Sequence, residues 1–288
     1  MKILKCFSEE SFYDSPFFNR QKGFHYLIET NRGDCIETGI YLHYWDEIEK
    51  SIAIDVSCMI GCPEKCFFCS SKNNKYIRNL TSDEILEEIF LILNLHPYLN
   101  FEKVVISFQG IGEPSLMPRE IISVAKSIRC IIPDCALNIS TTGVNIDAFK
   151  LWKESQVTWT HLQISATIDS LNNLKRIDEI VQYLDKERIG DYFIQIKFNY
   201  ILIENINDKE ENLKRLISIF RNKKYVIKLS KLNKFDNKVK LKSSSIERFK
   251  YFKNNLTKGG IKNYIFGSYI DSAISCGQLV YLINHQNE

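Results

Sequence analysis

Residues 51–69 read SIAIDVSCMIGCPEKCFFC, an apolar strand-like segment followed directly by a dense group of cysteines. Its first seven residues have the composition and alternation of a strand. Cys62, Cys66 and Cys69 then follow with the spacing C-x3-C-x2-C, and a fourth thiol, Cys58, lies just upstream. The stretch therefore places three closely spaced thiols in the loop that leaves a predicted strand.

From this strand onward the chain alternates between predicted strands and helices. In the first helix Thr81 is the expected N-cap with Glu84 three positions on, and Pro118 opens the second helix. About six β/α units predict the α/β class and a partial β/α (TIM-like) barrel, with its active site at the C-terminal ends of the strands. The strands are expected at residues 51–57, 103–108, 136–140, 161–166, 193–201 and 225–232.

A short β-hairpin is predicted before this series. Residues 24–29 and 35–42 have strand character and flank the turn sequence NRGD. No low-complexity segment divides the rest of the chain. We therefore expect an N-terminal extension over residues 1–49, and a barrel core with its C-terminal segment over residues 50–288.

The composition excludes several classes of protein. The chain has 288 residues, of which 44% are hydrophobic, and this is enough to bury a large core. Its longest apolar run, residues 85–95, carries glutamates and is shorter than a membrane span. The N-terminus lacks the apolar stretch of a secretory signal, so we expect a cytoplasmic protein with no membrane partner.

Positive charge is concentrated in the last third of the chain. Between Lys209 and Lys262 there are 17 Lys or Arg and four Asp or Glu residues, whereas the net charge of the whole chain is +3. This segment suits an anionic partner such as RNA. A set of solvated lysines explains it as well, and composition by itself slightly favours that second interpretation.

The cysteine group is compatible with four kinds of site. A disulfide is disfavoured in a reducing compartment, and a thioredoxin-type C-x-x-C leaves the third cysteine unexplained. A structural zinc ion needs four ligands, and Cys58 could complete such a set. An iron–sulfur cluster held by three thiolates leaves one iron open to bind a cofactor. The position after the first strand of the β/α series favours the cluster.

With this spacing in this place, the chain resembles the radical S-adenosylmethionine enzymes, whose hallmark is C-x3-C-x2-C after the first barrel strand. The resemblance implies that Cys62, Cys66 and Cys69 hold a 4Fe–4S cluster. The open iron would bind S-adenosylmethionine, and Phe68 would pack near its adenine. Ordinary loop packing is the alternative role for Phe68.

Further stretches resemble the radical enzymes that methylate C2 or C8 of an adenosine in 23S ribosomal RNA. The resemblance implies an adenosine of structured RNA as substrate and an electron donor such as flavodoxin or ferredoxin. These stretches occur in the family's order: GDCIET (33–38), RNLTSDEI (78–85), QGIGEP (109–114), NISTTGV (138–144), QISATID (163–169) and SCGQL (275–279).

The resemblance also implies roles for individual residues. Gly112 and Glu113 would contact the amino group of S-adenosylmethionine, in a charge-assisted hydrogen bond. Glu37 would handle protons at the substrate carbon, unless it is an ordinary exposed hairpin charge, and Cys276 would carry the methyl group. The residues expected to line the cofactor site are Ser140, Ser165, Thr167 and Asn233.

The chain departs from the family's pattern at Asp55 and at Thr167. Asp55 stands where the family has a second cysteine that resolves the protein–RNA adduct, with Cys58 three residues along, and Thr167 replaces a histidine. One alternative is therefore a radical S-adenosylmethionine enzyme that acts on a peptide or small molecule without cysteine methylation. Another is a zinc-stabilised RNA-binding protein without catalysis.

Overall fold

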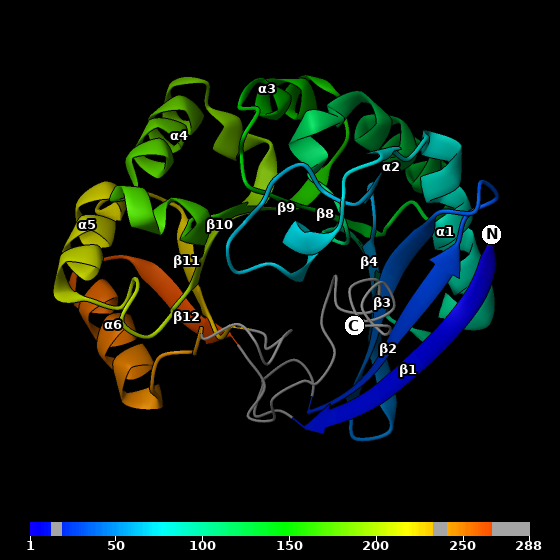
Figure 1. Cartoon of the computed structure of the whole chain (residues 1–288), viewed down its shortest axis with the longest axis horizontal. Helices are drawn as coiled ribbons and strands as arrows, with labels where there is room; N and C mark the ends of the chain where they lie inside the picture. Colours follow the sequence, from blue (N-terminus) through cyan, green and yellow to red (C-terminus); the bar gives the residue numbers. More distant parts are fainter. Residues whose placement is uncertain (13–18, 233–240, 267–288) are drawn as a thin grey trace. The chain divides into compact units, whose positions relative to one another are not determined.

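The computed structural model describes residues 1–12, 19–232 and 241–266 (Figure 1). The chain divides into two compact units, and each is described by itself. Unit 1 contains Met1–Ile139 and unit 2 contains Ser140–Gly267. The predicted boundary between residues 49 and 50 stays a prediction.

Unit 1 is built on an antiparallel meander that continues into parallel strands. Its sheet has the order β1-β2-β3-β4-β7-β8, with antiparallel pairing from β1 to β4 and parallel pairing of β4 with β7 and of β7 with β8. The strands are β1 (Lys2–Phe12), β2 (Arg20–Glu29), β3 (Cys35–Trp45), β4 (Ile48–Val56), β7 (Lys103–Phe108) and β8 (Ala136–Thr141).

The predicted hairpin is confirmed as β2 and β3, with Leu27 opposite Glu37 in its register. Its turn is closed by hydrogen bonds from Thr30 N to Asp34 O at 2.8 Å and from Gly33 N to Thr30 O at 3.0 Å. Gly33 has φ +81°, a conformation that favours glycine. Strand β1 was not predicted from the sequence.

Two helices of unit 1 begin where the sequence predicted. Helix α1 (Ser82–Leu95) has a capping box in which Glu84 N donates to Thr81 Oγ1 and Thr81 N donates to Glu84 Oε2. Helix α2 (Pro118–Ile131) has Pro118 at its first position. The buried face of α1 consists of Ile85, Glu88, Ile89, Ile92 and Leu93.

Unit 2 alternates strands and helices around a parallel sheet with the order β9-β10-β11-β12. The predicted strands are present, and β12 is an additional edge strand. The strands are β9 (Trp159–Ser165), β10 (Phe193–Ile201), β11 (Val226–Ser230) and β12 (Lys262–Phe266). The helices are α3 (Asp147–Glu154), α4 (Lys175–Lys186), α5 (Glu210–Phe220) and α6 (Ile246–Lys258).

Short elements complete the described chain. A two-stranded sheet joins β5 (Met59–Ile60) to β6 (Arg78–Asn79). The 3-10 helices are η1 (Ser70–Asn73), η2 (Tyr98–Asn100), η3 (Pro114–Leu116), η4 (Thr167–Asn172) and η5 (Ile189–Asp191). The predicted α/β class is confirmed.

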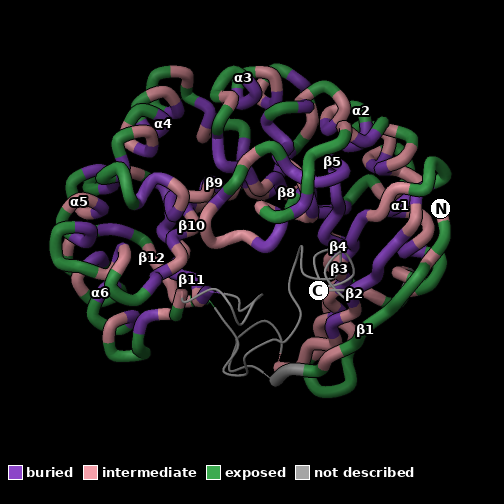
Figure 2. The backbone as a smooth tube through the Cα atoms, viewed as in Figure 1, coloured by how far each residue is buried: buried purple, intermediate pink, exposed green. Residues whose placement is uncertain are grey.

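Burial alternates along the strands and so separates a core face from a polar face. In β10, Phe198 and Tyr200 are buried, whereas Lys197 and Asn199, which alternate with them, are half-buried. Along β10 these two polar residues therefore lie on the face opposite to Phe198 and Tyr200. Figure 2 shows the burial of the whole described backbone by colour. None of the helices described is long and apolar enough to cross a membrane.

Candidate functional site

The cysteine loop of unit 1 is closed at its base by the β5–β6 pair. Ile77 N donates to Ile60 O at 2.9 Å and Leu80 N donates to Cys58 O at 3.0 Å. Gly61 has φ +69°, and a Cβ there would lie 2.1 Å from Lys75 O. A larger residue at position 61 would therefore push apart the two arms of the loop that carries the cysteines.

The three predicted cluster ligands lie within electrostatic reach of one another. Burial, together with the charges of Cys69 and Glu113, raises the pKa of Cys62 to about 12. Burial likewise raises the pKa of Cys66, with contributions from Cys69, Cys62 and Glu113. Cys69 has a pKa raised by burial, and Glu37 contributes to that rise. Three thiols and two carboxyl groups thus converge at one place.

The chemistry of these three thiols fits an iron–sulfur cluster, which cysteine thiolates hold. Across residues 1–12, 19–232 and 241–266, no three His, Cys, Asp or Glu side chains are arranged to hold one ion, as structural zinc requires. Cluster thiolates each bind a different iron, so three thiols would leave one iron of a 4Fe–4S cluster open. Because thiols bind metal as thiolates, loading would release the protons that burial retains.

The loop after β7 packs tightly against the strand end that leads into the cysteines. Cys58 N and Met59 N both donate to Ile111 O, at 2.8 and 3.1 Å. Gly112 has φ +122°, and a Cβ there would lie 2.5 Å from Cys58 Sγ and 2.9 Å from Met59 Cβ. Glycine at position 112 therefore allows a contact between the two loops that another residue would prevent.

Glu113 is held in place at the end of this loop. Its side chain is buried, and its Oε1 accepts a hydrogen bond from Ser115 N at 3.0 Å, which caps η3. Its charge acts on Cys58, Cys62 and Cys66. The structure thus brings Gly112 and Glu113 beside the cysteine loop, as the proposed cofactor site requires.

Glu37 is a buried residue of β3 rather than an exposed hairpin charge. It is 4% exposed, and its carbonyl oxygen accepts a hydrogen bond from Ser57 Oγ at 2.6 Å. Since its carboxyl group contributes to the raised pKa of Cys69, it faces the cysteine loop. The alternative of an ordinary exposed charge is therefore wrong.

The structure also shows the surroundings of Asp55, which replaces the family's second cysteine, and of Cys58 nearby in the sequence. Asp55 is buried and accepts a hydrogen bond from Gln109 Nε2 at 2.6 Å. Cys58 is 2% exposed, and burial, with the charge of Glu113, raises its pKa well above the usual range. The role of Gln109 was not predicted, although it stands in the quoted QGIGEP stretch.

Unit 2 contains three further predicted residues. Ser140 Oγ accepts a hydrogen bond from Gln163 Nε2 at 2.9 Å. Ser165 Oγ is buried and has no hydrogen-bond partner among the described residues. Thr167 is fully buried, and its Oγ1 accepts from Ile201 N at 2.7 Å, so this hydroxyl is engaged by the backbone.

Of the three remaining predicted residues, the structure describes only Phe68. Phe68 is half-buried in the cysteine loop and packs edge to face on Phe67, with ring centroids 5.3 Å apart. Asn233 and Cys276 lie outside the described residues. Their predicted roles in cofactor binding and methyl transfer stay predictions.

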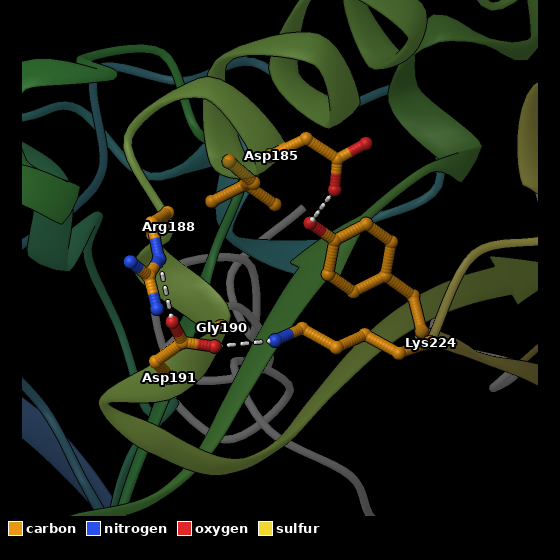
Figure 3. A pocket seen from close by; sticks show the side chains of 7 residues that line it. Asp185, Arg188, Gly190, Asp191 and Lys224 are labelled. Carbon is orange, nitrogen blue, oxygen red and sulfur yellow. Dashed lines mark hydrogen bonds and ion pairs between the residues drawn. The ribbon is translucent and has the colours of Figure 1, made fainter.

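A hollow of about 270 Å³ in unit 2 is lined by none of the predicted site residues (Figure 3). Its charged groups are already paired: Asp191 bonds to Arg188 Nε at 3.0 Å and to Lys224 Nζ at 2.7 Å. Tyr225 donates to Asp185 at 2.5 Å. These residues lie near the N-terminal ends of β10 and β11, which is the stabilising end of a β/α fold.

Comparison with known proteins finds relatives of the chain among proteins named RNA methyltransferases. No protein-family model matches it. It is 30% identical over 275 residues to the probable dual-specificity RNA methyltransferase RlmN of Thermotoga sp. (strain RQ2), covering 88% of this chain and 74% of that protein. It is 26% identical over 277 residues to the dual-specificity RNA methyltransferase RlmN of Sulfurovum sp. (strain NBC37-1), covering 88% and 76%.

A solved structure shows the same fold. The crystal structure of a radical SAM methyltransferase from Sphaerobacter thermophilus matches with a TM-score of 0.73 and 22% identity. The match covers 95% of this chain and 80% of that one. This likeness confirms the predicted fold class over nearly the whole chain.

Proposed function

The chain belongs to the family of dual-specificity RNA methyltransferases RlmN, and from this membership we propose that it is a radical S-adenosylmethionine enzyme that methylates an adenosine of structured RNA. The observation that carries the proposal is the convergence of Cys62, Cys66 and Cys69 with Glu113 and Glu37 in unit 1. Three thiolates can hold a cluster with one open iron, and a nearby carboxylate can bind the amino group of S-adenosylmethionine.

The cysteine loop would hold the 4Fe–4S cluster through its three thiols. The cluster and S-adenosylmethionine, when bound, supply the one-electron chemistry that methylation of an amidine carbon requires. Glu113 would bind the amino group of S-adenosylmethionine, because a buried carboxylate forms a strong charge-assisted bond to an ammonium. Ser115 N orients that carboxylate, and Phe68 would cover the adenine.

Glu37 would hold or move a proton at the substrate carbon. Its burial supports this role, since a carboxyl group shielded from water acts on substrate groups rather than on solvent. Ser57 fixes its backbone through the 2.6 Å hydrogen bond. In unit 2, Ser140, Ser165 and Thr167 would line the cofactor site together with Asn233. Support comes from the buried Ser165 hydroxyl, which has no hydrogen-bond partner among the described residues.

Cys276 would carry the methyl group, a role supported by its place in the SCGQL stretch. Asp55 cannot form the disulfide that releases the product in the family's pattern. Cys58 is a poor substitute because its buried, protonated sulfur is packed against Gly112. Product release in this chain would therefore use a group other than these two.

The basic segment 209–262 would contact RNA phosphates, and flavodoxin or ferredoxin would supply the electron. Helices α5 and α6 carry part of this segment, and Arg248 lies over the rings of Tyr251 and Phe252. Phosphate binding by lysines and arginines predicts an affinity for RNA that falls as salt increases.

Mass spectrometry of the anaerobically reconstituted chain tests the proposal. Given S-adenosylmethionine and a reductant, the peptide that contains Cys276 should gain one methyl group. The peptide with Cys130, an exposed thiol on α2, should gain none and serves as the internal control. The Glu37→Gln variant should still methylate Cys276 but should not transfer labelled methyl groups to unmodified ribosomal RNA.

A second candidate function rests on Asp55. A chain without the resolving cysteine could act on a peptide or small molecule by the same cluster chemistry, without cysteine methylation. Formation of 5′-deoxyadenosine with no methyl group on Cys276 and none on ribosomal RNA would overturn the first proposal in favour of this one.

A further inference from the structure

Helix α1 buries one carboxyl group within its apolar face. Glu88 is 0% exposed, while the neighbouring buried positions of the same face are Ile85, Ile89 and Ile92. Burying a carboxyl group is costly unless its oxygens are bonded. Glu88 Oε1 accepts hydrogen bonds from Thr38 Oγ1 and, at 3.1 Å, from Ser57 N, while Oε2 has no partner in the part of the chain that the structure describes.

The partners of Glu88 connect it to the two loops of the candidate site. Ser57 Oγ donates to the carbonyl of Glu37 at 2.6 Å and accepts from Ile111 N at 3.1 Å. Thr38 is the next residue after Glu37 on β3. One side chain on α1 therefore contacts β3, the end of β4 and, through Ser57, the segment 109–113.

The protonation state of Glu88 allows its side chain to stay buried and hydrogen-bonded at neutral pH. Burial raises the pKa of Glu88 to about 8, although the bonds from Thr38 and Ser57 oppose this rise, so it is a neutral acid at pH 7. From a neighbouring element the Cys58 thiol, itself protonated, lies within its electrostatic reach. On its own helix, Glu84 and Glu87 bond to Arg78 and to the amino terminus.

We propose that Glu88 is a positioning residue for the reaction: it holds Glu37 and the segment that carries Glu113 in place through Thr38 and Ser57. The part of this inference that concerns methyl transfer rests on the proposed function. An apolar residue at position 88 would fill the space but would leave Ser57 N, a buried backbone donor, without its acceptor.

Hydrogen exchange of the full-length chain without cofactor tests the positioning directly. In Glu88→Ala, the amides of Ser57 and Ile111 should exchange about tenfold faster than in the wild type, because each loses its support. Glu88→Gln keeps an oxygen acceptor and a neutral group, so it should restore wild-type exchange. Glu87→Gln, a change on the exposed side of the same helix, is the matched control and should have no effect.

Raising the pH gives a second readout that a merely space-filling side chain would not produce. Above about pH 8 the wild type should ionise Glu88 and lose protection at Ser57 relative to Glu88→Gln, which cannot ionise. Unchanged exchange at Ser57 and Ile111 in Glu88→Ala would overturn the proposal. The proposal would also be overturned if the amides of β1 exchanged faster by the same factor as those of Ser57 and Ile111, since that result would indicate general destabilisation.

Activity separates this inference from the proposed function. With the reconstituted chain, Glu88→Ala should retain its iron but form less methylated ribosomal RNA, mainly through a lower kcat, and Glu88→Gln should restore it. If the wild type transfers no methyl group to ribosomal RNA, the proposed function fails, and the exchange measurements still decide whether Glu88 positions the two loops.

Discussion

Replacing Gly112 by alanine tests how closely the two loops of the candidate site must approach. The added Cβ would lie 2.5 Å from Cys58 Sγ and 2.9 Å from two carbon atoms of Met59. Unstrained contacts between such atoms lie at about 3.5–4.0 Å. The backbone at position 112 also has φ +122°, which side-chain-bearing residues rarely adopt.

Both effects lower the free energy of unfolding. Backbone strain costs about 1–3 kcal/mol. Overpacking in a well-packed interior costs about another 1–3 kcal/mol. We therefore expect Gly112→Ala to destabilise the chain by about 2–6 kcal/mol. Urea unfolding followed by circular dichroism measures this change, as a shift of the midpoint at constant slope.

Gly33 provides the matched control. It also has a positive φ of +81°, but a Cβ there would meet nothing within 4 Å. Gly33→Ala should therefore show the backbone strain without the overpacking. Because Cys58→Ala removes the sulfur, it should reduce the cost of Gly112→Ala by about 1–2 kcal/mol in a double-mutant cycle.

Two results would refute this reasoning. If Gly112→Ala lowered the free energy of unfolding by no more than Gly33→Ala does, the two loops would be able to move apart freely. Strict additivity with Cys58→Ala would show that the sulfur does not limit the approach. In either case Gly112 would not be required for placing Glu113 beside the cysteines.

Three further predictions follow from the same unit. Arg78→Ala removes paired hydrogen bonds to two carboxylates and should lower the free energy of unfolding in urea by about 1–3 kcal/mol. The control is Arg32→Ala: because the Arg32 side chain is 60% exposed, this change should lower it by under about 0.5 kcal/mol. Replacing any of the three predicted cluster ligands by serine should abolish iron binding and the broad absorption at about 400 nm. Cys58→Ala should keep both, whereas in a four-thiolate zinc site Cys58 would be a ligand and its loss would impair metal binding. Because the pKa of Glu88 is raised from 4.5 to about 8, the wild type should lose stability relative to Glu88→Gln as pH rises between those values, by a total of about 3–5 kcal/mol, and a pH-independent difference would contradict this.

Local patterns in the sequence were sufficient for most of the regular elements. The α1 capping box and the opening of α2 at Pro118 depend on contacts within a few residues, so their sequence pattern identifies them. Strand β1 has the sequence KILKCFSEESF, with charges on both faces, and it forms because it pairs with β2. Strand β12 is short and lies at a sheet edge, where pairing with β11 decides its conformation.

Only those residues of the candidate site that belong to short local motifs could be predicted from the sequence. Cys62, Cys66 and Cys69, and the adjacent pair Gly112 and Glu113, could be proposed from the sequence because each group lies within one short motif. Glu88 could not be, because it stands within an apolar helical face and its partner Ser57 is 31 residues away in the chain.

The sequence by itself determined the α/β class, the alternation of strands and helices after residue 50, and the three-thiol spacing that points to an iron–sulfur cluster. Tertiary structure alone decided that Cys58 is packed against Gly112 and that Glu37 is buried near Cys69. It also decided that Ser57 joins Glu37 to Ile111, 54 residues beyond Ser57. The physical reason is that burial and hydrogen bonding between distant segments depend on how strands pair and loops pack, and a local pattern does not record these contacts.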